Sequence, residues 1–352
     1  MRVVHVVWSM QAGGLEAMLL DVCRQQGCDH DVHIVVVNAL YDSALASSCA
    51  GRYAVHRIER PVGSRNPWYL AKLFARLLML RPDILHLHQL SLMNVLYYAH
   101  APMVATVHDT KFDLPREPWR CQRAICISTA VEHAVRKCLP QLATVVVHNG
   151  VCAAGIDRQV RKPESAFRIV QVSRLVHEKK GQDVLLRAAQ KLRESRADFQ
   201  FQIDFLGGGP SLDYLQAMAA SLDLSNHVRF LGEVARPDVY RSLGSYDLLV
   251  QPSRYEGFGL TVVEAMMASV PVLVSNIEGP LEIIHDGLYG DYFVNGDELD
   301  LAAKLVAVAL RAPADKAKRC ETARLFALEN FEIGMTAKRY NALYEECLRV
   351  GT

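Results

Sequence analysis

The chain has 352 residues, of which 51% are hydrophobic, and a formal net charge of +1. This length predicts two domains, each with its own core, and the balanced charge excludes a global basic field for nucleic acid. No run of about 18 apolar residues and no signal-peptide pattern occurs, and the nine cysteines form no C-x-x-C pair. These features predict a cytoplasmic protein with reduced thiols and no membrane span.

Charge is distributed unevenly along the chain. Residues 1–160 hold 16 Lys and Arg against 12 Asp and Glu, and ten of the 13 histidines. A basic first half suits an anionic acceptor or a membrane surface.

The first predicted unit is a strand, a glycine loop and a helix. Arg2–Trp8 is a buried-strand run, and Gly13 and Gly14 precede a helix that reaches Cys23. Glycines here allow the backbone to approach a ligand, although they also suit an ordinary turn. The dehydrogenase fingerprint G-x-G-x-x-G is absent.

A second strand is predicted over His33–Val37 and an amphipathic helix over Trp68–Leu80. Lys72, Arg76 and Arg81 lie on or beside this helix. Two interpretations remain open: a helix on a membrane surface, or a packing helix with a solvated face. The packing helix is the favoured interpretation.

Two further strands end in histidine. They are Ile84–His88, with His86 and His88, and Met103–Asp109, with His108 and Asp109. In an open parallel sheet, ligands bind beyond the carboxyl ends of strands, so these side chains are site candidates. The alternative is a histidine bonded to a loop backbone. The polar loop that follows carries Lys111 and Arg116, and loops of this kind often carry residues that bind a substrate.

The second domain is predicted to begin after a linker at 152–165, giving domains at 1–155 and 165–330 and a closing helix at 331–352. Its first strand, Arg168–Arg174, leads to Lys179 and Lys180. Fixed cations there would neutralise a phosphate leaving group. Phe201–Leu206 is another strand and leads into a glycine loop that contains Gly208.

The most informative stretch is residues 250–284. A short strand ends near Val250, a loop carries Glu256, and a helix follows over Leu260–Ala268 with Glu264 in it. A helix N-terminus after a glycine loop attracts anions. Two structural alternatives are a capping box formed by Thr261 and Glu264, and a solvated Glu256. Another strand is expected over Val270–Val274.

The segment SRYEGFGLTVVEAM resembles the E-x7-E signature of retaining glycosyltransferases with the GT-B fold, in the family called GT4. The resemblance implies two Rossmann-like, doubly wound α/β domains that face a central cleft. The first domain would bind the acceptor and the second the nucleotide-sugar donor. The closing helix would pack back on the first domain.

The resemblance also implies roles for the candidate residues. Catalytic roles fall to Glu256, which binds sugar hydroxyls, to His108 near the reacting carbon, and to Arg174 and Lys180 on the diphosphate. Glu264 would accept from ribose hydroxyls. The remaining donor-side residues are Gly13, Gly14, Lys179, Gly208 and the backbone of Phe258, Gly259 and Leu260; the acceptor side holds His86, His88, Asp109, Lys111 and Arg116.

The expected reaction moves a sugar, with retention, from a UDP- or GDP-sugar to a saccharide or lipid-linked saccharide in cell-surface polysaccharide or lipopolysaccharide synthesis. Neither cofactor nor metal is expected, because the D-x-D at Asp29 and Asp31 precedes a strand. Peripheral contact with the inner face of the membrane is expected, and no nucleic acid. The alternatives are a non-catalytic nucleotide-sugar-binding partner and a GT-B epimerase or phosphorylase.

Overall fold

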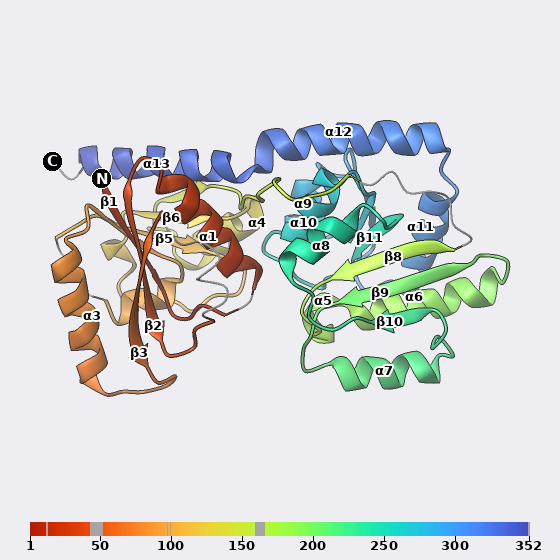
Figure 1. Ribbon diagram of the computed structural model, residues 1–352, viewed down its shortest axis with the longest axis horizontal. Coiled ribbons are helices and arrows are strands. Elements are labelled where there is room, and N and C mark those ends of the chain that lie inside the picture. Colours follow the sequence, from red (N-terminus) through yellow and green to blue (C-terminus); the bar gives the residue numbers. More distant parts are fainter. Residues whose placement is uncertain (12, 43–51, 97, 99, 159–165, 351–352) are drawn as a thin grey trace. The chain divides into compact units, whose positions relative to one another are not determined.

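The computed structural model describes residues 1–11, 13–42, 52–96, 98, 100–158 and 166–350 (Figure 1). The chain divides into two compact units. Unit 1 comprises Met1–Cys152 together with Phe331–Thr352, and unit 2 comprises Ala153–Asn330. The divisions lie close to the boundaries expected at 155 and 330.

Unit 1 contains a seven-stranded sheet in the order β3-β2-β1-β4-β5-β6-β7, and every pair is parallel. Most of its strands are buried on both faces, which explains their nearly continuous apolar sequences. The strands are β1 (Arg2–Val7), β2 (Asp31–Asn38), β3 (Ala54–Arg60), β4 (Ile84–Leu87), β5 (Met103–Val107), β6 (Arg123–Cys126) and β7 (Thr144–Val146).

The α-helices described in unit 1 are α1 (Gly14–Gln26), α3 (Pro67–Leu80), α4 (Thr129–Cys138) and α13 (Ile333–Val350), and short 3-10 turns are η1 (Leu90–Asn94) and η2 (Pro118–Arg120). Local capping fixes where α3 and α4 begin. The Asn66 side chain accepts a hydrogen bond from Trp68 N at 3.0 Å, and Ser128 Oγ accepts from Val131 N at 3.2 Å.

Unit 2 contains a six-stranded parallel sheet in the order β10-β9-β8-β11-β12-β13. The strands are β8 (Phe167–Val172), β9 (Phe201–Leu206), β10 (Val228–Phe230), β11 (Leu248–Gln251), β12 (Val272–Ser275) and β13 (Asp291–Phe293). The expected strand at Val270 begins two residues later, because Val270 N bonds Ala265 O at 2.9 Å and closes the turn after α9.

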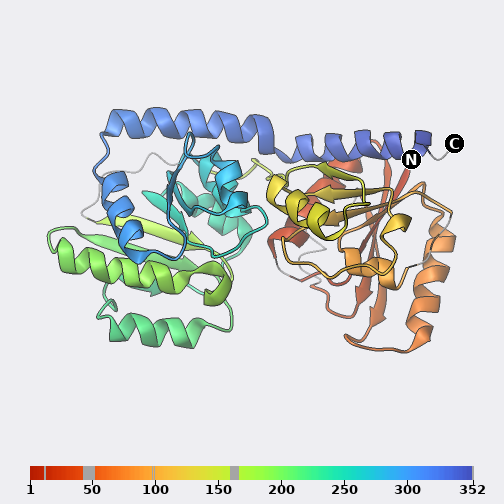
Figure 2. The same ribbon diagram turned by 180° about the vertical axis from the view of Figure 1, so that it is seen from behind.

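The helices of unit 2 are α5 (His177–Lys180), α6 (Gln182–Ser195), α7 (Leu212–Ser221), α8 (Arg236–Leu243), α9 (Leu260–Met267), α10 (Glu278–Ile283), α11 (Glu298–Ala309) and α12 (Pro313–Phe331). Figures 1 and 2 show α6 and α7 on one side of this sheet and α9 and α12 on the other. The sheet is therefore doubly wound, as predicted.

The last helix returns to the first unit. Val151 N donates to Phe331 O at 2.8 Å, and Ile333 N donates to Val151 O at 3.1 Å, so the chain segments are bonded where α13 begins. A Cβ on Gly150 would lie 2.7 Å from Ile333 Cα, so only glycine permits this approach. None of the described helices combines the length and hydropathy needed to cross a membrane.

Each sheet reverses its strand order once. In unit 1 the reversal lies between β1 and β4, and in unit 2 between β8 and β11. Ligands of open α/β sheets bind beyond the carboxyl ends of the strands at such a switch point. The loops after β1, β4, β8 and β11 are thus the places to look for a site.

Candidate active site

The switch point of unit 2 brings together two predicted residues, Lys180 and Glu256. Lys180 ends the short helix after β8, and Glu256 lies in the loop after β11. The Lys180 Nζ forms an ion pair with Glu256 Oε2. Gln251 Nε2 and Ser253 Oγ lie 3.2 and 3.4 Å from the same oxygen. Both charged side chains are largely buried, so the pair lies in an environment that strengthens its electrostatics.

A second ion pair, which the sequence did not reveal, fixes the loop that carries Glu256. Arg254 Nη1 and Nη2 donate to the two carboxylate oxygens of Asp183 at 2.8 and 2.7 Å. Burial raises the pKa of Asp183, but hydrogen bonds from Arg254 and Arg187 outweigh it and leave the pKa below its ordinary value. This bidentate pair joins the β11 loop to α6. The signal in the sequence that could have indicated it is the arginine two residues before Glu256.

Gly181 allows the two loops to approach. It has φ +66°, and a Cβ there would lie 1.9 Å from Pro252 O. Only glycine meets both conditions without strain. Because Gly181 permits this close approach, the preceding residue, Lys180, lies next to the β11 loop.

The glycine loop after β9 has a similar packing role. A Cβ on Gly207, which has φ +140°, would lie 2.0 Å from Ser173 O, while Gly208 O accepts from Leu175 N at 2.8 Å. The loop thus supports the backbone of residues 173–175, and Gly208 bonds the residue that follows Arg174. Packing against the β8 loop explains why glycine is needed at 207.

The N-terminus of α9 differs from the predicted capping box. Gly259, with φ +129°, is the N-cap and makes no side-chain cap, so Thr261 lies one position too far into the helix to cap it. The capping-box alternative for Glu264 is wrong. The eight-residue helix α9 begins at Leu260, two residues after the buried Phe258, and its first backbone amides are free of intrahelical hydrogen bonds.

Glu264 is instead held by a tyrosine from a neighbouring helix. Tyr240 Oη donates to Glu264 Oε1 at 3.1 Å, and Arg236 Nε donates to Tyr240 Oη at 2.8 Å. Burial and then the Glu264 charge raise the pKa of Tyr240, which keeps the phenol protonated as a donor. Sequence reasoning missed both partners.

The other two predicted cations of unit 2 are placed differently. Arg174 is exposed in the loop after β8, and no hydrogen bond or ion pair joins its guanidinium to a described residue. Lys179 Nζ lies 5.0 Å from the centre of the Tyr255 ring, in a cation–π arrangement. Lys180, and not Lys179, is the lysine that reaches Glu256.

In unit 1, Gly13 is the N-cap of α1 and Gly14 is its first residue; both are exposed. A Cβ on Gly13 would meet only the end of the Glu16 side chain, at 2.5 Å. A flexible side chain can move, so the fold itself does not require glycine here. Burial raises the pKa of Glu16.

His108 lies on a hollow of about 570 Å³ whose described lining comes entirely from unit 1. His88, Asp109 and Lys111 also line it. Asp109 Oδ1 lies 3.4 Å from both Thr110 Oγ1 and Lys111 N, so this carboxylate stabilises the turn after β5. Arg116 is exposed but does not line the hollow.

A chain of histidines leads inward from this hollow, from the half-buried His108 to the buried His88 and His5. His108 Nε2 lies 3.3 Å from His88 Nδ1, His88 Nε2 lies 3.0 Å from His5 Nδ1, and His5 Nε2 lies 2.9 Å from Gln26 Oε1. Burial lowers the pKa of His5 to about 4 and that of His108 to about 3, and lowers that of His88 well below 6.5. All three are neutral at pH 7.

The prediction that His86 contacts an acceptor is wrong. Its side chain is fully buried, with Nδ1 2.6 Å from Tyr344 Oη on α13 and Nε2 2.7 Å from Thr106 Oγ1. Alternation along β4 does not explain this, because His86 and His88 lie on the same side of the strand. What separates them is α13, which covers His86 and which no local sequence pattern reveals.

Ligand nitrogens of His5, His86 and His88 lie within 4.8 Å of one another, a spacing that a metal ion requires. The His86 and His88 rings, however, are stacked at 4.4 Å with an interplanar angle of 24°. Stacked rings do not direct their nitrogens at one ion, and the hydrogen bonds above already engage these nitrogens. The geometry is that of a hydrogen-bonded cluster.

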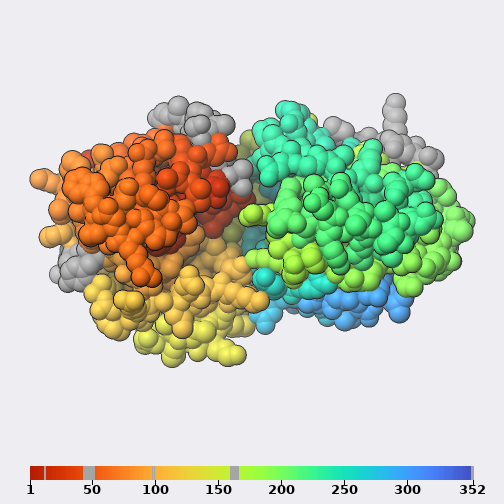
Figure 3. All heavy atoms as spheres, turned by 90° about the horizontal axis from the view of Figure 1, so that it is seen from below, coloured from red at the N-terminus to blue at the C-terminus, as the bar shows by residue number. Residues whose placement is uncertain are grey.

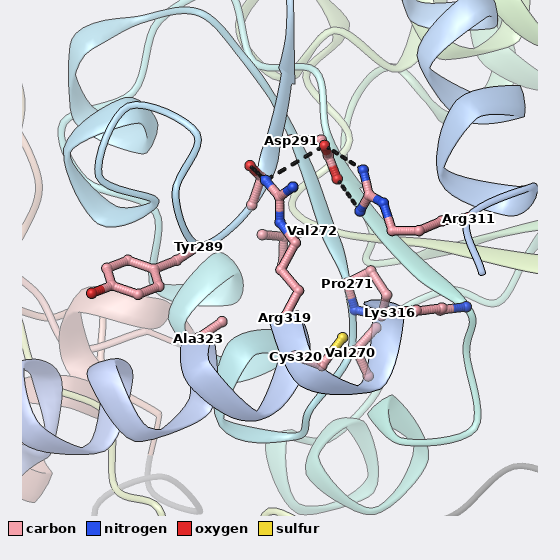
Figure 4. A pocket seen from close by; sticks show the side chains of 11 residues that line it. Val270, Pro271, Val272, Tyr289, Asp291, Arg311, Lys316, Arg319, Cys320 and Ala323 are labelled. Carbon is pink, nitrogen blue, oxygen red and sulfur yellow. Dashed lines mark hydrogen bonds and ion pairs between the residues drawn. The ribbon is translucent and has the colours of Figure 1, made fainter. Parts of the chain in front are cut away.

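A small cavity in unit 2, of about 10 Å³, lies away from the switch point (Figure 4). Arg311 Nη1 and Nη2 donate to Asp291 at 2.9 and 2.8 Å, and Arg319 Nη2 lies 3.6 Å from the same carboxylate. The space holds about one water molecule. The Arg319 contact joins α12 to β13, and the Arg311 pair joins the segment before α12 to the same strand, so the cavity is structural.

Comparisons with known proteins agree with this architecture. The profile of the family described as Glycosyltransferase Family 4 matches residues 12–154, and that of Glycosyl transferases group 1 matches residues 155–324. A glycogen synthase of Mycobacterium tuberculosis is 28% identical over 72% of this chain and 66% of its own length. A GDP-mannose-dependent alpha-(1-6)-phosphatidylinositol monomannoside mannosyltransferase of Mycolicibacterium smegmatis is 33% identical over 47% of this chain and 44% of its own.

The match thus spans two thirds or less of these relatives. Among solved structures, Anabaena HepE in complex with UDP and glucose superposes with a TM-score of 0.80 at 20% identity, covering 98% of this chain and 100% of that one. With two doubly wound parallel-sheet units, the fold is GT-B. The chain belongs to the GT4 family of glycosyltransferases.

Proposed function

We propose that this protein transfers a sugar, with retention of configuration, from a UDP- or GDP-sugar to a hydroxyl of a saccharide or lipid-linked saccharide. The observation that carries the proposal is the Lys180–Glu256 ion pair at the switch point of unit 2. A carboxylate and a cation thus lie side by side at the edge where nucleotides bind in such sheets, and in this proposal the carboxylate binds sugar hydroxyls and the cation a phosphate.

Unit 2 supplies the groups for the donor. Arg174, Lys180 and the amides that begin α9 would hold the diphosphate, whose charge grows as it leaves. Glu264, held by Tyr240, would accept from ribose hydroxyls. In this proposal Lys180 exchanges part of its bond to Glu256 for a phosphate oxygen, and the departing phosphate takes the acceptor's proton.

The reaction is proposed to need no metal. Asp31 begins β2 and pairs with Arg2 at 2.6 Å, so the D-x-D segment lies at the amino end of its strand. The proposed site lies beyond carboxyl ends of strands, and Arg174 and Lys180 would neutralise the diphosphate in place of a divalent ion. Full activity in EDTA is expected, and its loss would contradict this assignment.

The donor and acceptor classes rest on the relatives. HepE was solved in complex with UDP and glucose, and the Mycolicibacterium enzyme is named for GDP-mannose and a phosphatidylinositol monomannoside. Both UDP and GDP therefore remain in the proposal. A lipid-linked acceptor in cell-surface polysaccharide or lipopolysaccharide synthesis would be reached from the cytoplasm at the inner face of the membrane.

Helix α3 supports contact with such a surface. Its inner face buries Leu73, Leu77 and Leu80. Its outer face is not the solvated polar face expected, because Trp68, Leu78 and Met79 are 67%, 53% and 64% exposed. The segment that carries α3 lies at the surface of unit 1 (orange in Figure 3).

Charge around α3 favours an anionic lipid surface over a neutral one. Residues 60–82 contain Arg60, Arg65, Lys72, Arg76 and Arg81 and no acidic residue. An apolar stripe with a cationic border suits the interface of a bilayer that holds anionic lipid. We expect sedimentation with vesicles of mixed phosphatidylglycerol and phosphatidylcholine, and a large loss in the variant Trp68→Ser, Met79→Ser.

The matched control is Leu310→Ser, which removes a side chain that is 65% exposed on unit 2. It should sediment like the parent protein. Equal binding to pure phosphatidylcholine vesicles, or no effect of the α3 changes, would contradict the proposed surface.

The proposed function is tested by thermal unfolding with UDP-, GDP- and ADP-sugars in EDTA. A donor at about 100 times its dissociation constant adds roughly 2.7 kcal/mol to the stability of the native state. A transfer assay with the stabilising donor then separates the alternatives. A non-catalytic partner would bind without turnover, an epimerase or phosphorylase would alter the donor without an acceptor, and an inverted product would contradict retention.

A further inference from the structure

Three histidines of unit 1 and one glutamine form a chain of hydrogen bonds in which every bond has the same donor-to-acceptor direction. It begins at Gln26 on α1 and runs through His5 on β1 and His88 after β4 to His108 after β5. A neutral imidazole has one nitrogen that donates and one that accepts. In a chain of neutral imidazoles, the group at one end therefore sets the tautomer of each ring.

Gln26 supplies that end group. Its Nε2 donates to Asn341 Oδ1 at 2.9 Å, which turns its Oε1 toward His5 Nε2. An amide oxygen only accepts, so His5 carries its proton on Nε2 and accepts at Nδ1. His88 must then donate from Nε2 and accept at Nδ1, and His108 must donate from Nε2.

The opposite polarity would need both amides reversed and a proton on His108 Nδ1. That atom is buried and has no hydrogen-bond partner among the residues that the structure describes. A buried N–H without an acceptor is rarer in proteins than an unmatched acceptor. The outer end of the chain thus agrees with the assignment made at the inner end.

At its inner end the chain meets the Gln26 amide, which neither releases nor takes up a proton near neutral pH. The arrangement therefore fixes protons instead of conducting them. We infer that Gln26, His5 and His88 form a tautomer lock that holds His108 as a neutral imidazole with its proton on Nε2.

This lock would serve the proposed function, on which its catalytic role rests. Glycosyl transfer develops positive charge at the anomeric carbon, and an imidazolium in the His108 position would oppose it. A neutral ring with a fixed orientation lines the hollow without that penalty. Gln26, His5 and His88 are then positioning residues, because they act through His108.

The direct test is a long-range ¹H–¹⁵N correlation spectrum of the full chain labelled with [¹⁵N]histidine, assigned with single-histidine variants. At pH 7 we expect His5, His88 and His108 to be neutral and protonated on Nε2. Protonation of any of them on Nδ1, or an imidazolium, would overturn the lock. This readout needs no substrate and holds whether or not the proposed reaction is correct.

A second test removes the end group. In Gln26→Met the three rings should lose the uniform Nε2 proton, whereas Gln26→Glu keeps an acceptor oxygen and should retain it. Gln25→Met changes the exposed neighbour on α1 and should alter nothing. If Gln26→Met is unfolded, the parent spectrum and Gln26→Glu still decide.

The kinetic consequence is a fall in kcat of about tenfold for Gln26→Met, comparable with the loss of partners that orient metal-bound histidines. The KM for the donor should stay within about twofold, and Gln26→Glu should restore kcat. An altered tautomer with unchanged kcat would refute the catalytic role while leaving the lock. An unchanged tautomer would refute the lock itself.

Discussion

The two units place polar groups at the same edge of similar sheets, but they stabilise those groups in different ways. In unit 2 the groups are charged, and ion pairs hold them: Lys180 with Glu256, and Arg254 with Asp183. In unit 1 the groups are neutral histidines in a hydrogen-bonded chain that ends at Gln26.

The difference follows from what each edge is proposed to bind. A diphosphate brings negative charge that cations must meet, whereas a sugar at the reacting carbon needs hydrogen bonds and no added positive charge. The two edges should therefore respond differently to backbone strain, to acid and to the loss of single hydroxyls.

The largest effect on stability is expected for Gly181→Ala, which attacks the packing beneath the charged site. The new Cβ would lie 1.9 Å from Pro252 O at a φ of +66°. We expect a loss of more than about 3 kcal/mol in the unfolding free energy of unit 2, from αL strain and the clash together. Urea unfolding measures it.

Gly155→Ala is the matched control, because Gly155 also has positive φ, +89°, but no atom of a described residue lies within 4 Å of its added Cβ. It should cost only about 1–2 kcal/mol, the strain of the conformation alone. Equal losses in the two variants would show that the loops are not held as closely as described.

Acid should affect the two units in separate pH ranges. The folded pKa values of His5 and His108, about 4 and about 3, lie below the ordinary 6.5. At pH values between the folded pKa and 6.5, each of these histidines binds more protons in the unfolded chain than in the folded one. Unit 1 should then lose about 1.4 kcal/mol per pH unit for each histidine as pH falls from 6.5 toward 4.

Asp183 in unit 2 has a folded pKa below its ordinary 3.8, so its contribution is lost only as pH falls below that value. Tryptophan fluorescence of unit 1, which contains Trp8, Trp68 and Trp119, should follow the earlier transition. Acid loss of unit 2 before unit 1 would contradict the comparison.

The smallest effect is expected for Tyr240→Phe, which removes one hydrogen bond to Glu264 and leaves the charged pairs in place. A typical hydrogen bond contributes about 0.5–1.5 kcal/mol, and because Tyr240 acts on the donor only through Glu264, donor affinity should weaken about three- to tenfold. Calorimetric titration with the donor measures it. Tyr292→Phe, on a partly exposed tyrosine of β13, should leave affinity unchanged, and equal effects would refute the role of Tyr240.

Much of the fold could be predicted because its signals are local. Buried parallel strands such as Arg2–Val7 are continuous apolar runs, and glycines at 13, 181 and 259 mark the loops that follow them. Lys180 and Glu256 could be predicted at one site, since both lie in the connections that follow strands of one switch point, but their direct ion pair could not.

The rest depends on contacts between distant segments. Arg254 meets Asp183 across 71 positions, and His86 meets Tyr344 across 258. No spacing rule anticipates either. The capping box failed for a different reason: Gly259, two residues before Thr261, is the N-cap of α9, so Thr261 lies inside the helix and cannot cap it.

The central claim is that Glu256 acts on the transferred sugar, and the most direct test compares turnover with donor affinity in Glu256→Gln. We predict a fall in turnover of about 10²–10³, as for the loss of one group that stabilises a transition state, with donor affinity within about tenfold of the parent. Unchanged turnover, or an affinity loss that accounts for all of the fall, would contradict the account.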